Sequence, residues 1–311
     1  MKKVFNGFLF LTLVMFVLAG CSTKAPGSSE KASTTDKKTG KIKIGLSIST
    51  LNNPFFVSLK EGAEKEAKAQ GADIITVDAQ NDSAKQVSDI EDLIQKGVDV
   101  LLVNPADSDA VKTAIESANK ANIPVITVDR SANGGNVVSH IASDNVAGGK
   151  MAGDFILEKL GKKGNVVELE GIPGSSAARE RGEGFHKAIE GISGIKVVAK
   201  QAADFDRAKG LSVMENILQA NKNIQAVFAH NDEMALGALQ AIAAAGLKNV
   251  IVVGFDATAD AVKAVNEGKM AATVAQKPTE IGQKGVQTAV KVVNKESVDK
   301  FIPVSLDLIK K

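Results

Sequence analysis

Hydrophobic and polar positions along the chain repeat with two periods, one typical of strands and one typical of helices. The first apolar-rich run, 42–49, contains β-branched residues and predicts a strand. Pro54 comes soon after this run, behind two asparagines, as is common at the first position of a helix. The helix that follows would bury one face, which carries Phe56, Leu59, Ala63 and Ala67. The pattern therefore predicts a strand followed by an amphipathic helix.

The same unit recurs along the chain. Further strands of a first series are predicted at 73–77, 98–103 and 125–128, each followed by a helical pattern. A second series begins after Asp144, with strands at 165–169, 196–200, 226–229 and 250–253. Because alternating strands and helices build parallel sheets, we predict an α/β fold made of two doubly wound parallel-sheet lobes.

The end of the chain carries shorter elements. We predict a strand at 271–274, a helix at 279–294 and one final strand at 303–309. These elements could return to the first lobe, so that the two lobes would share several crossings. The order of elements alone leaves this point open.

The first residues have the pattern of an export signal. Lys2 and Lys3 precede an apolar run, 8–18, that is too short to span a bilayer comfortably. The sequence Leu-Ala-Gly-Cys at 18–21 resembles the bacterial lipobox, whose cysteine is lipidated. We therefore expect a signal peptide at 1–20, lipidation of Cys21 and an extracytoplasmic protein anchored to the membrane by lipid. The alternatives are a transmembrane anchor or an ordinary secretory signal with a chance cysteine.

Composition narrows the possible classes of protein. Residues 21–41 are mostly small and polar, which predicts a flexible tether between the lipid and the folded part. The chain is 44% hydrophobic and 24% charged with a net charge of +2, and it has no basic stripe that would suit nucleic acid. Cys21 is its one cysteine, so an intramolecular disulfide is impossible. Stability must come from the hydrophobic core.

Polar residues gather where the predicted strands end. Ligands of open α/β sheets bind beyond the carboxyl ends of strands. These ends include the segments 49–56, 104–107, 129–130, 178–181, 204–206, 230–232 and 255–256, with Gln276 after a later strand. Their side chains are mainly Asp, Asn, Gln, Arg and Phe. Carboxylate, amide and guanidinium groups can each meet two sugar hydroxyls, and aromatic rings pack on the C–H faces of a sugar.

Some of these residues have simpler explanations. Asn and Asp at strand ends often serve as turn and helix-cap residues, which is our favoured interpretation for Asp107, Asp232 and Thr258. The adjacent Phe55 and Phe56 could equally belong to the core. Each of the three histidines, at 140, 186 and 230, is expected at the surface or in packing, because no metal-ligand spacing joins them.

Several longer segments together resemble the ribose-binding proteins of the type I periplasmic sugar-binding family. They are 49–56, 123–130, 176–182, 203–207 and 231–237, and the resemblance covers the chain from Ile42 onward. It implies a receptor of D-ribose, and no enzyme, that delivers the sugar to a membrane ABC permease and acts as a monomer. Two lobes would be joined by a multi-strand hinge, one formed by 42–143 with 277–305 and the other by 144–276 with 306–311.

The resemblance also implies the residues of the site. Hydrogen bonds to the sugar would come from Asn53, Asp129, Arg130, Arg181, Asn231, Asp256 and Gln276. Ring contacts would come from Phe55, Phe56 and Phe205. The chain departs from the pattern of its better-known relatives at His230, where they have Gln, which bears on the surroundings of the site more than on the sugar.

Other functions find less support in the sequence. It contains neither a glycine-rich phosphate loop nor a serine elbow, and no acidic calcium loop, so we expect no cofactor, no metal and no catalytic residue. A sugar-sensing regulator would need a DNA-reading segment before Ile42, where the signal and tether stand. An enzyme using Asp129 or Asp256, and a receptor for a related pentose or a furanose signalling molecule, remain alternatives.

Overall fold

The computed structural model describes residues 40–311. The predicted signal peptide, Cys21 and nearly all of the predicted tether lie outside the described residues. Gly40 and Lys41, the last two tether residues, are exposed and precede the first strand. No helix within 40–311 is long and apolar enough to cross a membrane.

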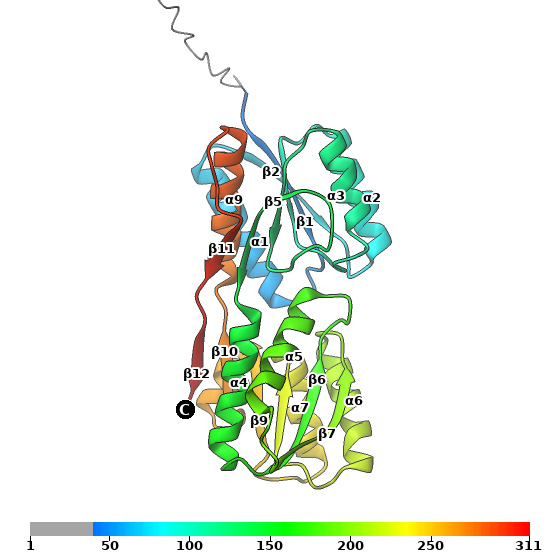
Figure 1. Ribbon diagram of the computed structural model, residues 1–311, viewed down its shortest axis with the longest axis vertical. Coiled ribbons are helices and arrows are strands. Elements are labelled where there is room, and N and C mark those ends of the chain that lie inside the picture. The colour runs from blue at the N-terminus through cyan, green and yellow to red at the C-terminus, as the bar shows by residue number, and fades with distance from the viewer. Residues whose placement is uncertain (1–39) are drawn as a thin grey trace, which may run out of the picture. The chain divides into compact units, whose positions relative to one another are not determined.

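The strands of residues 40–311 form two six-stranded sheets (Figure 1). The first sheet has the order β11-β5-β4-β3-β1-β2 and the second the order β12-β10-β9-β8-β6-β7. The strands of the first sheet are β1 Lys43–Ile48, β2 Asp73–Asp78, β3 Val100–Val103, β4 Val125–Val128, β5 Val137–Ser143 and β11 Phe301–Val304. Those of the second are β6 Gly164–Glu170, β7 Ile195–Ala202, β8 Ala226–Ala229, β9 Ile251–Asp256, β10 Ala272–Ala275 and β12 Asp307–Lys310. Pairing is parallel throughout, except between β10 and β12.

Helices cover both sheets, and each sheet with its helices is one lobe. The first lobe contains α1 Pro54–Ala69, α2 Ser83–Gln95, α3 Lys112–Lys120 and α9 Pro278–Val293. The second contains α4 Asn145–Leu160, α5 Ser176–Ile189, α6 Arg207–Ala220, α7 Asp232–Ala244 and α8 Ala259–Asn266. Two hydrophobic clusters belong to each lobe, with fully buried side chains such as Leu59, Leu102, Phe185 and Phe228 at their centres. The fold class predicted from the sequence is confirmed.

Helix α9 shows why the late elements return to the first lobe. It packs against α1, although more than two hundred residues separate them in the chain (Figure 1). Gly62 of α1 and Gly282 of α9 lie at this contact, where a Cβ on either one would collide with backbone atoms of the other helix. The missing side chains let the two helices approach closely. Phe56, Leu59, Ala63 and Ala67 of α1 are all buried, as the sequence pattern predicts.

The end of the chain differs from the prediction. We expected one strand at 303–309, but the structure has two, because β11 pairs with β5 in the first sheet and β12 pairs with β10 in the second. Both lie on the red C-terminal segment of Figure 1. The chain thus passes between the lobes after β5, after β10 and between β11 and β12.

The prediction also missed β5, which has no continuous apolar run. Its sequence includes Ser139 and His140, and a Gly-rich segment comes shortly before it. Both polar side chains have partners in the structure. Ser139 donates to the Asp299 carbonyl at 2.7 Å, and the His140 ring lies 2.9 Å from the Thr127 hydroxyl.

Candidate functional site

A small cavity lies between the carboxyl ends of the strands of the two lobes. Its empty volume is about 230 Å³. It is lined by Asn53, Phe55, Phe56, Asp129, Arg130, Ala177, Arg181, Phe205, Asn231, Asp256 and Gln276. All ten residues that the sequence analysis assigns to sugar binding are in this set, and Ala177 is the one addition.

Helix α1 brings three of these residues to the cavity. Asn53 caps the helix, since its Oδ1 accepts a hydrogen bond from the backbone N–H of Phe55 at 2.9 Å. The rings of Phe55 and Phe56 stand at 88° to each other with centroids 5.2 Å apart. Both rings line the cavity and also belong to a hydrophobic cluster of the first lobe. Core packing and a place in the site are therefore not alternatives for these two residues.

Asp129 and Arg130 follow β4 directly. Asp129 has a φ of +64°, a left-handed conformation that turns the chain sharply at the strand end. Its Oδ2 accepts a hydrogen bond from the amide of Asn104 at 3.3 Å. Burial raises the pKa of Asp129, and the neighbouring Arg130 and Arg181 oppose that rise. The first lobe thus contributes the carboxyl group of Asp129, which accepts a hydrogen bond from a neutral amide.

The guanidinium of Arg130 lies between two aromatic rings. It is 5.0 Å from the centroid of Phe56 in the first lobe and 5.1 Å from that of Phe205 in the second. Its Nη1 donates to the Pro105 carbonyl at 3.3 Å. Burial lowers the pKa of Arg130 to about 10, which leaves it charged at neutral pH. Cation–π contacts of such a desolvated cation help to hold the lobes together around the cavity.

Arg181 is the main cation of the second lobe. The sequence analysis placed it with the strand ends, but it lies within helix α5, which packs against α4. Its Nε donates to Asn145 Oδ1 at 2.9 Å, and its Nη1 donates to the carbonyl of His230 at 2.7 Å. The guanidinium also lies 3.9 Å from the ring centroid of Phe255. These contacts fix the position of its guanidinium group.

Asp256 faces Arg181 from the end of β9. Its Oδ1 is 3.7 Å from Arg181 Nη1 and accepts a hydrogen bond from Gln276 Nε2 at 2.9 Å. Burial raises the pKa of Asp256 to about 7, against the opposing effect of Arg181. The cavity therefore holds a carboxyl group whose charge state changes near neutral pH.

Three buried polar atoms at this cavity have no hydrogen-bond partner among the described residues. They are Asp129 Oδ1, Arg130 Nε and Gln276 Oε1. Nearly all buried polar groups in folded proteins are paired, so such atoms call for an explanation. Two acceptors and one donor, contributed by both lobes, match a small ligand that carries several hydroxyl groups.

Comparison with known proteins decides the family. A family model described as "Periplasmic binding protein domain" matches residues 44–297. The chain belongs to the periplasmic binding protein family. The ribose import binding protein of Bacillus subtilis is similar, with 54% identity over 308 residues that cover 99% of each chain. That of Escherichia coli is 58% identical over 268 residues, which cover 86% of this chain and 90% of the relative.

Solved structures agree with this family. An ABC transporter solute-binding protein from Mycobacterium smegmatis, with bound glycerol, superimposes with a TM-score of 0.84 at 37% identity. The match covers 87% of this chain and 94% of that one. Members of this family are sugar-binding transport proteins and not enzymes, and the same description holds for this periplasmic binding protein.

One helix cap in this periplasmic binding protein differs from our expectation. We interpreted Asp232 as the cap of its own helix, but the N-cap of α7 is Asn231, whose Oδ1 accepts from the Met234 N–H at 3.0 Å. Asp232 is the first residue of α7, is fully buried and bonds to residues far along the chain. Asn231 also lines the cavity, so it caps a helix and belongs to the site.

Two other strand-end residues are structural, in line with the simpler explanation. Asp107 Oδ1 accepts hydrogen bonds from the N–H groups of Asp109 and Ala110, both at 2.8 Å, and so stabilises a turn. Thr258 is the N-cap residue of α8, although its hydroxyl makes no hydrogen bond to that helix. Neither residue lines the cavity.

Two of the three histidines, His186 and His230, share one partner although they are far apart in the sequence. Glu168, which is fully buried in β6, contacts His186 Nε2 at 2.6 Å and His230 Nε2 at 3.0 Å. Although burial favours the neutral form, the hydrogen bonds with His230 and His186 hold the pKa of Glu168 below its ordinary value. No group of three or more side chains within 40–311 is arranged to hold a metal ion.

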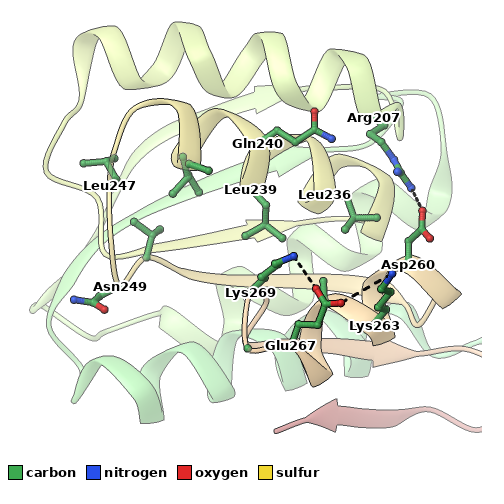
Figure 2. A pocket seen from close by; sticks show the side chains of 15 residues that line it. Arg207, Leu236, Leu239, Gln240, Leu247, Asn249, Asp260, Lys263, Glu267 and Lys269 are labelled. Carbon is green, nitrogen blue, oxygen red and sulfur yellow. Dashed lines mark hydrogen bonds and ion pairs between the residues drawn. The ribbon is translucent and has the colours of Figure 1, made fainter.

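A larger groove lies elsewhere on the second lobe, over α7 and α8 (Figure 2). Its empty volume is about 1410 Å³, and it includes Leu236, Leu239 and Leu247. Its charged residues are already paired, as in the contacts of Arg207 with Asp260 and of Lys269 with Glu267. The groove shares no residue with the cavity between the lobes.

Proposed function

We propose that this protein is an extracytoplasmic receptor that captures D-ribose and delivers it to a membrane ABC importer. The observation that carries the proposal is the set of unpartnered polar atoms from both lobes, on Asp129, Arg130 and Gln276, in a cavity of about 230 Å³. The flanking rings of Phe55, Phe56 and Phe205 offer flat faces for a sugar ring. Similarity to ribose import binding proteins supports ribose over other small polyols.

A calorimetric panel tests the choice of ligand. D-Ribose, other pentoses, hexoses and a ribose-derived signalling furanose are titrated into the protein without residues 1–21. We expect D-ribose to bind at least tenfold more tightly than the others. Tighter binding of another pentose or of the furanose would assign the receptor to that ligand. Turnover of a bound sugar would overturn the non-catalytic function.

We further propose that the lobes close around the sugar, the first moving as 42–143 with 277–305 and the second as 144–276 with 306–311. Polar groups from both lobes at one cavity support closure, because an open form would separate them. Saturating D-ribose should lower the radius of gyration in small-angle X-ray scattering, with a forward intensity that matches a monomer. Identical curves with and without sugar would contradict closure. Intrinsic fluorescence is a poor probe, because the chain has no Trp and no Tyr.

The anchor is part of the same proposal. A lipidated Cys21 would hold the receptor at the membrane beside its importer, and the polar segment 21–41 would allow it to reach the permease. Mass spectrometry of the protein extracted from its host membrane should find an acylated N-terminal cysteine. An intact Met1, or a secreted form with an unmodified cysteine, would disprove the anchor and leave the sugar-binding proposal unaffected.

A further inference from the structure

The turn that carries Asp256 into the cavity is strained. Asp256 has a φ of +117° and the next residue, Ala257, a φ of +58°, although neither is glycine. Conformations of this kind persist only where the surrounding structure holds them, and they often occur at binding sites. The residues that hold this turn therefore affect where the Asp256 carboxyl lies.

Two threonines, Thr258 and Thr273, link this turn to the side chain of Asp232. The backbone N–H of Ala257 donates to Thr273 Oγ1 at 3.2 Å. The Thr273 hydroxyl in turn donates to Asp232 Oδ1 at 2.7 Å. The backbone N–H of Thr258 donates to Asp232 Oδ2 at 2.7 Å, and its hydroxyl does so at 3.2 Å. Thr258 therefore bonds to Asp232 directly, and Ala257 is linked to Asp232 through the Thr273 hydroxyl.

The surroundings leave Asp232 little freedom. It is fully buried as the first residue of α7, and it receives hydrogen bonds from Thr258, which precedes α8, and from Thr273 of β10. The N-termini of α7 and α8 thus meet at its carboxyl group. A side chain at Gly254 of β9 would collide with Asp232 Oδ1, so the strand passes directly over the carboxylate. The sequence distance to Thr273 is 41 residues, which makes this a tertiary contact and not a local cap.

We propose that Asp232 is a positioning residue of the binding site, which holds the strained Asp256–Ala257 turn so that the Asp256 carboxyl faces the ligand. The inference rests on the proposed function, since it takes the cavity as a sugar site. Asp232 does not line the cavity and acts only through Asp256. Burial and the nearby Asp256 raise the pKa of Asp232 well above its ordinary value, as expected for two carboxyl groups that lie close together.

The first experiment compares variants that remove parts of this network with one that only weakens the core. Asp232→Asn keeps the size of the side chain but lacks one acceptor, and Thr273→Val lacks the hydroxyl that links Ala257 to Asp232. Val252→Ala is the control, because Val252 is fully buried in β9, four residues before Asp256, and takes no part in the hydrogen bonds of the turn. Calorimetry with D-ribose and thermal melts without sugar are recorded for each.

We expect Asp232→Asn to raise the Kd for D-ribose about tenfold or more, and Thr273→Val to raise it by a smaller factor. Val252→Ala should lower the melting temperature but leave Kd within about twofold of the wild-type value. If Asp232→Asn does not fold, Thr273→Val carries the test. Equal losses of affinity in Val252→Ala and in the network variants, at equal losses of stability, would overturn the proposal.

A rescue experiment separates positioning from general stability. Glycine adopts positive φ without strain, so Ala257→Gly removes part of what Asp232 must hold. In the Asp232→Asn background, Ala257→Gly should return Kd to within about threefold of the Ala257→Gly single variant. Rescue would not occur if Asp232 merely stabilised the core, and its absence would count against the proposal.

A measurement without sugar tests the role of Asp232 independently of the proposed function. Hydrogen exchange of the Ala257 and Thr258 amides, followed by NMR, should speed up at least tenfold in Asp232→Asn and not in Val252→Ala. A wild-type protein that binds no sugar would overturn the proposed function, while these exchange rates would still test the hold on the turn. Wild-type ribose binding together with unchanged exchange and unchanged Kd in Asp232→Asn would overturn the positioning role alone.

Discussion

The two lobes present the same group to the cavity in different ways. Asp129 of the first lobe and Asp256 of the second both end a strand, have positive φ values and are buried. Asp129 is supported by the neutral amide of Asn104, which donates to it. Asp256 has a second carboxylate, Asp232, behind its turn.

The two carboxyl groups share their main electrostatic feature, because burial raises the pKa of both and an amide donor, Asn104 at Asp129 and Gln276 at Asp256, opposes that rise. They differ in that Asp256 also has the carboxyl group of Asp232 close behind its turn, whose own pKa is raised by burial and by Asp256. Each lobe balances its acid with an arginine, Arg130 in the first and Arg181 in the second. We expect the second lobe to offer a group that titrates near pH 7.

The largest effect should come from removing a charged member of the second-lobe set. Asp256→Ala or Arg181→Ala leaves desolvated partners unpaired, which typically costs about 2 to 5 kcal/mol of binding free energy. This corresponds to a Kd for D-ribose that rises roughly thirtyfold to several thousandfold. Calorimetry measures the loss, and a cooperative melt shows that the variant is folded. Asp256→Ala binding within about threefold of wild type would remove Asp256 from the site.

The second prediction concerns pH and the raised pKa of Asp256, about 7 against an ordinary value of 3.8. A carboxyl with a raised folded-state pKa binds its proton more tightly when folded. Its contribution to stability is full below about pH 4 and is lost as the pH rises to 7 and above. From pH 5.5 to pH 8 the ligand-free protein should lose about 2 kcal/mol from this group alone.

Asp256→Asn isolates that effect, because the other titrating groups remain in both proteins. Denaturant unfolding of the two proteins at pH 5.5 and pH 8 gives the difference. Wild type should lose stability relative to Asp256→Asn as the pH rises. A difference that stays constant, or that changes in the opposite direction, would mean that Asp256 ionises at its ordinary pKa.

The fold was largely predictable from the sequence, and its exceptions have physical reasons. Buried parallel strands read as continuous apolar runs, which made β3, β4 and β8 easy to find. β5 lacks such a run, because Ser139 and His140 find tertiary partners. The last run of apolar residues could not reveal that β11 and β12 belong to different sheets, since strand pairing depends on the returning helix α9.

The residues that line the cavity could be predicted from the sequence, but the residues that support them could not. The strand-end rule located the polar groups, including Arg181, although that residue lies on helix α5 and not at a strand end. Asn104 and Asp232 were missed as supporting residues, because the partners of their side chains lie 24 to 55 residues away for Asn104 and up to 41 for Asp232. No local pattern encodes such contacts. Asp232 next to Asn231 looked like one helix cap, and the structure shows two separate roles.

The third prediction gives Asp129 of the first lobe a neighbouring carboxyl group, as Asp256 of the second lobe has in Asp232. Asn104→Asp places a carboxyl group against Asp129, where the amide now donates to Asp129 and to the Val128 carbonyl. At low pH the new group is neutral and can still donate one hydrogen bond. At higher pH it ionises or forces Asp129 to stay protonated, because like charges oppose each other.

We therefore expect the Kd of Asn104→Asp for D-ribose to rise about tenfold relative to wild type between pH 5.5 and pH 8. Calorimetry at both pH values measures this change. Gln86→Met is the matched control, since Gln86 supports the same strand ends through Ser47 and Ala106 without touching Asp129. A similar pH dependence in Gln86→Met would show that loop stability, and not the pairing with Asp129, is responsible.

The smallest predicted effect is a difference in ligand binding between variants of two helix N-caps in the first lobe, Asp82 and Asn53. Asp82 caps α2 from an exposed position, where its Oδ1 accepts from the Lys85 N–H at 3.0 Å, and Asn53 caps α1 while lining the cavity. Replacing either cap by alanine should lower the free energy of unfolding by about 1 kcal/mol, as is usual for the loss of an N-cap. Only Asn53→Ala should also weaken D-ribose binding, because its amide faces the cavity as well as the helix. Urea unfolding and calorimetry on both variants make the comparison, and a loss of affinity in Asp82→Ala equal to that in Asn53→Ala would mean that cap strength alone governs binding.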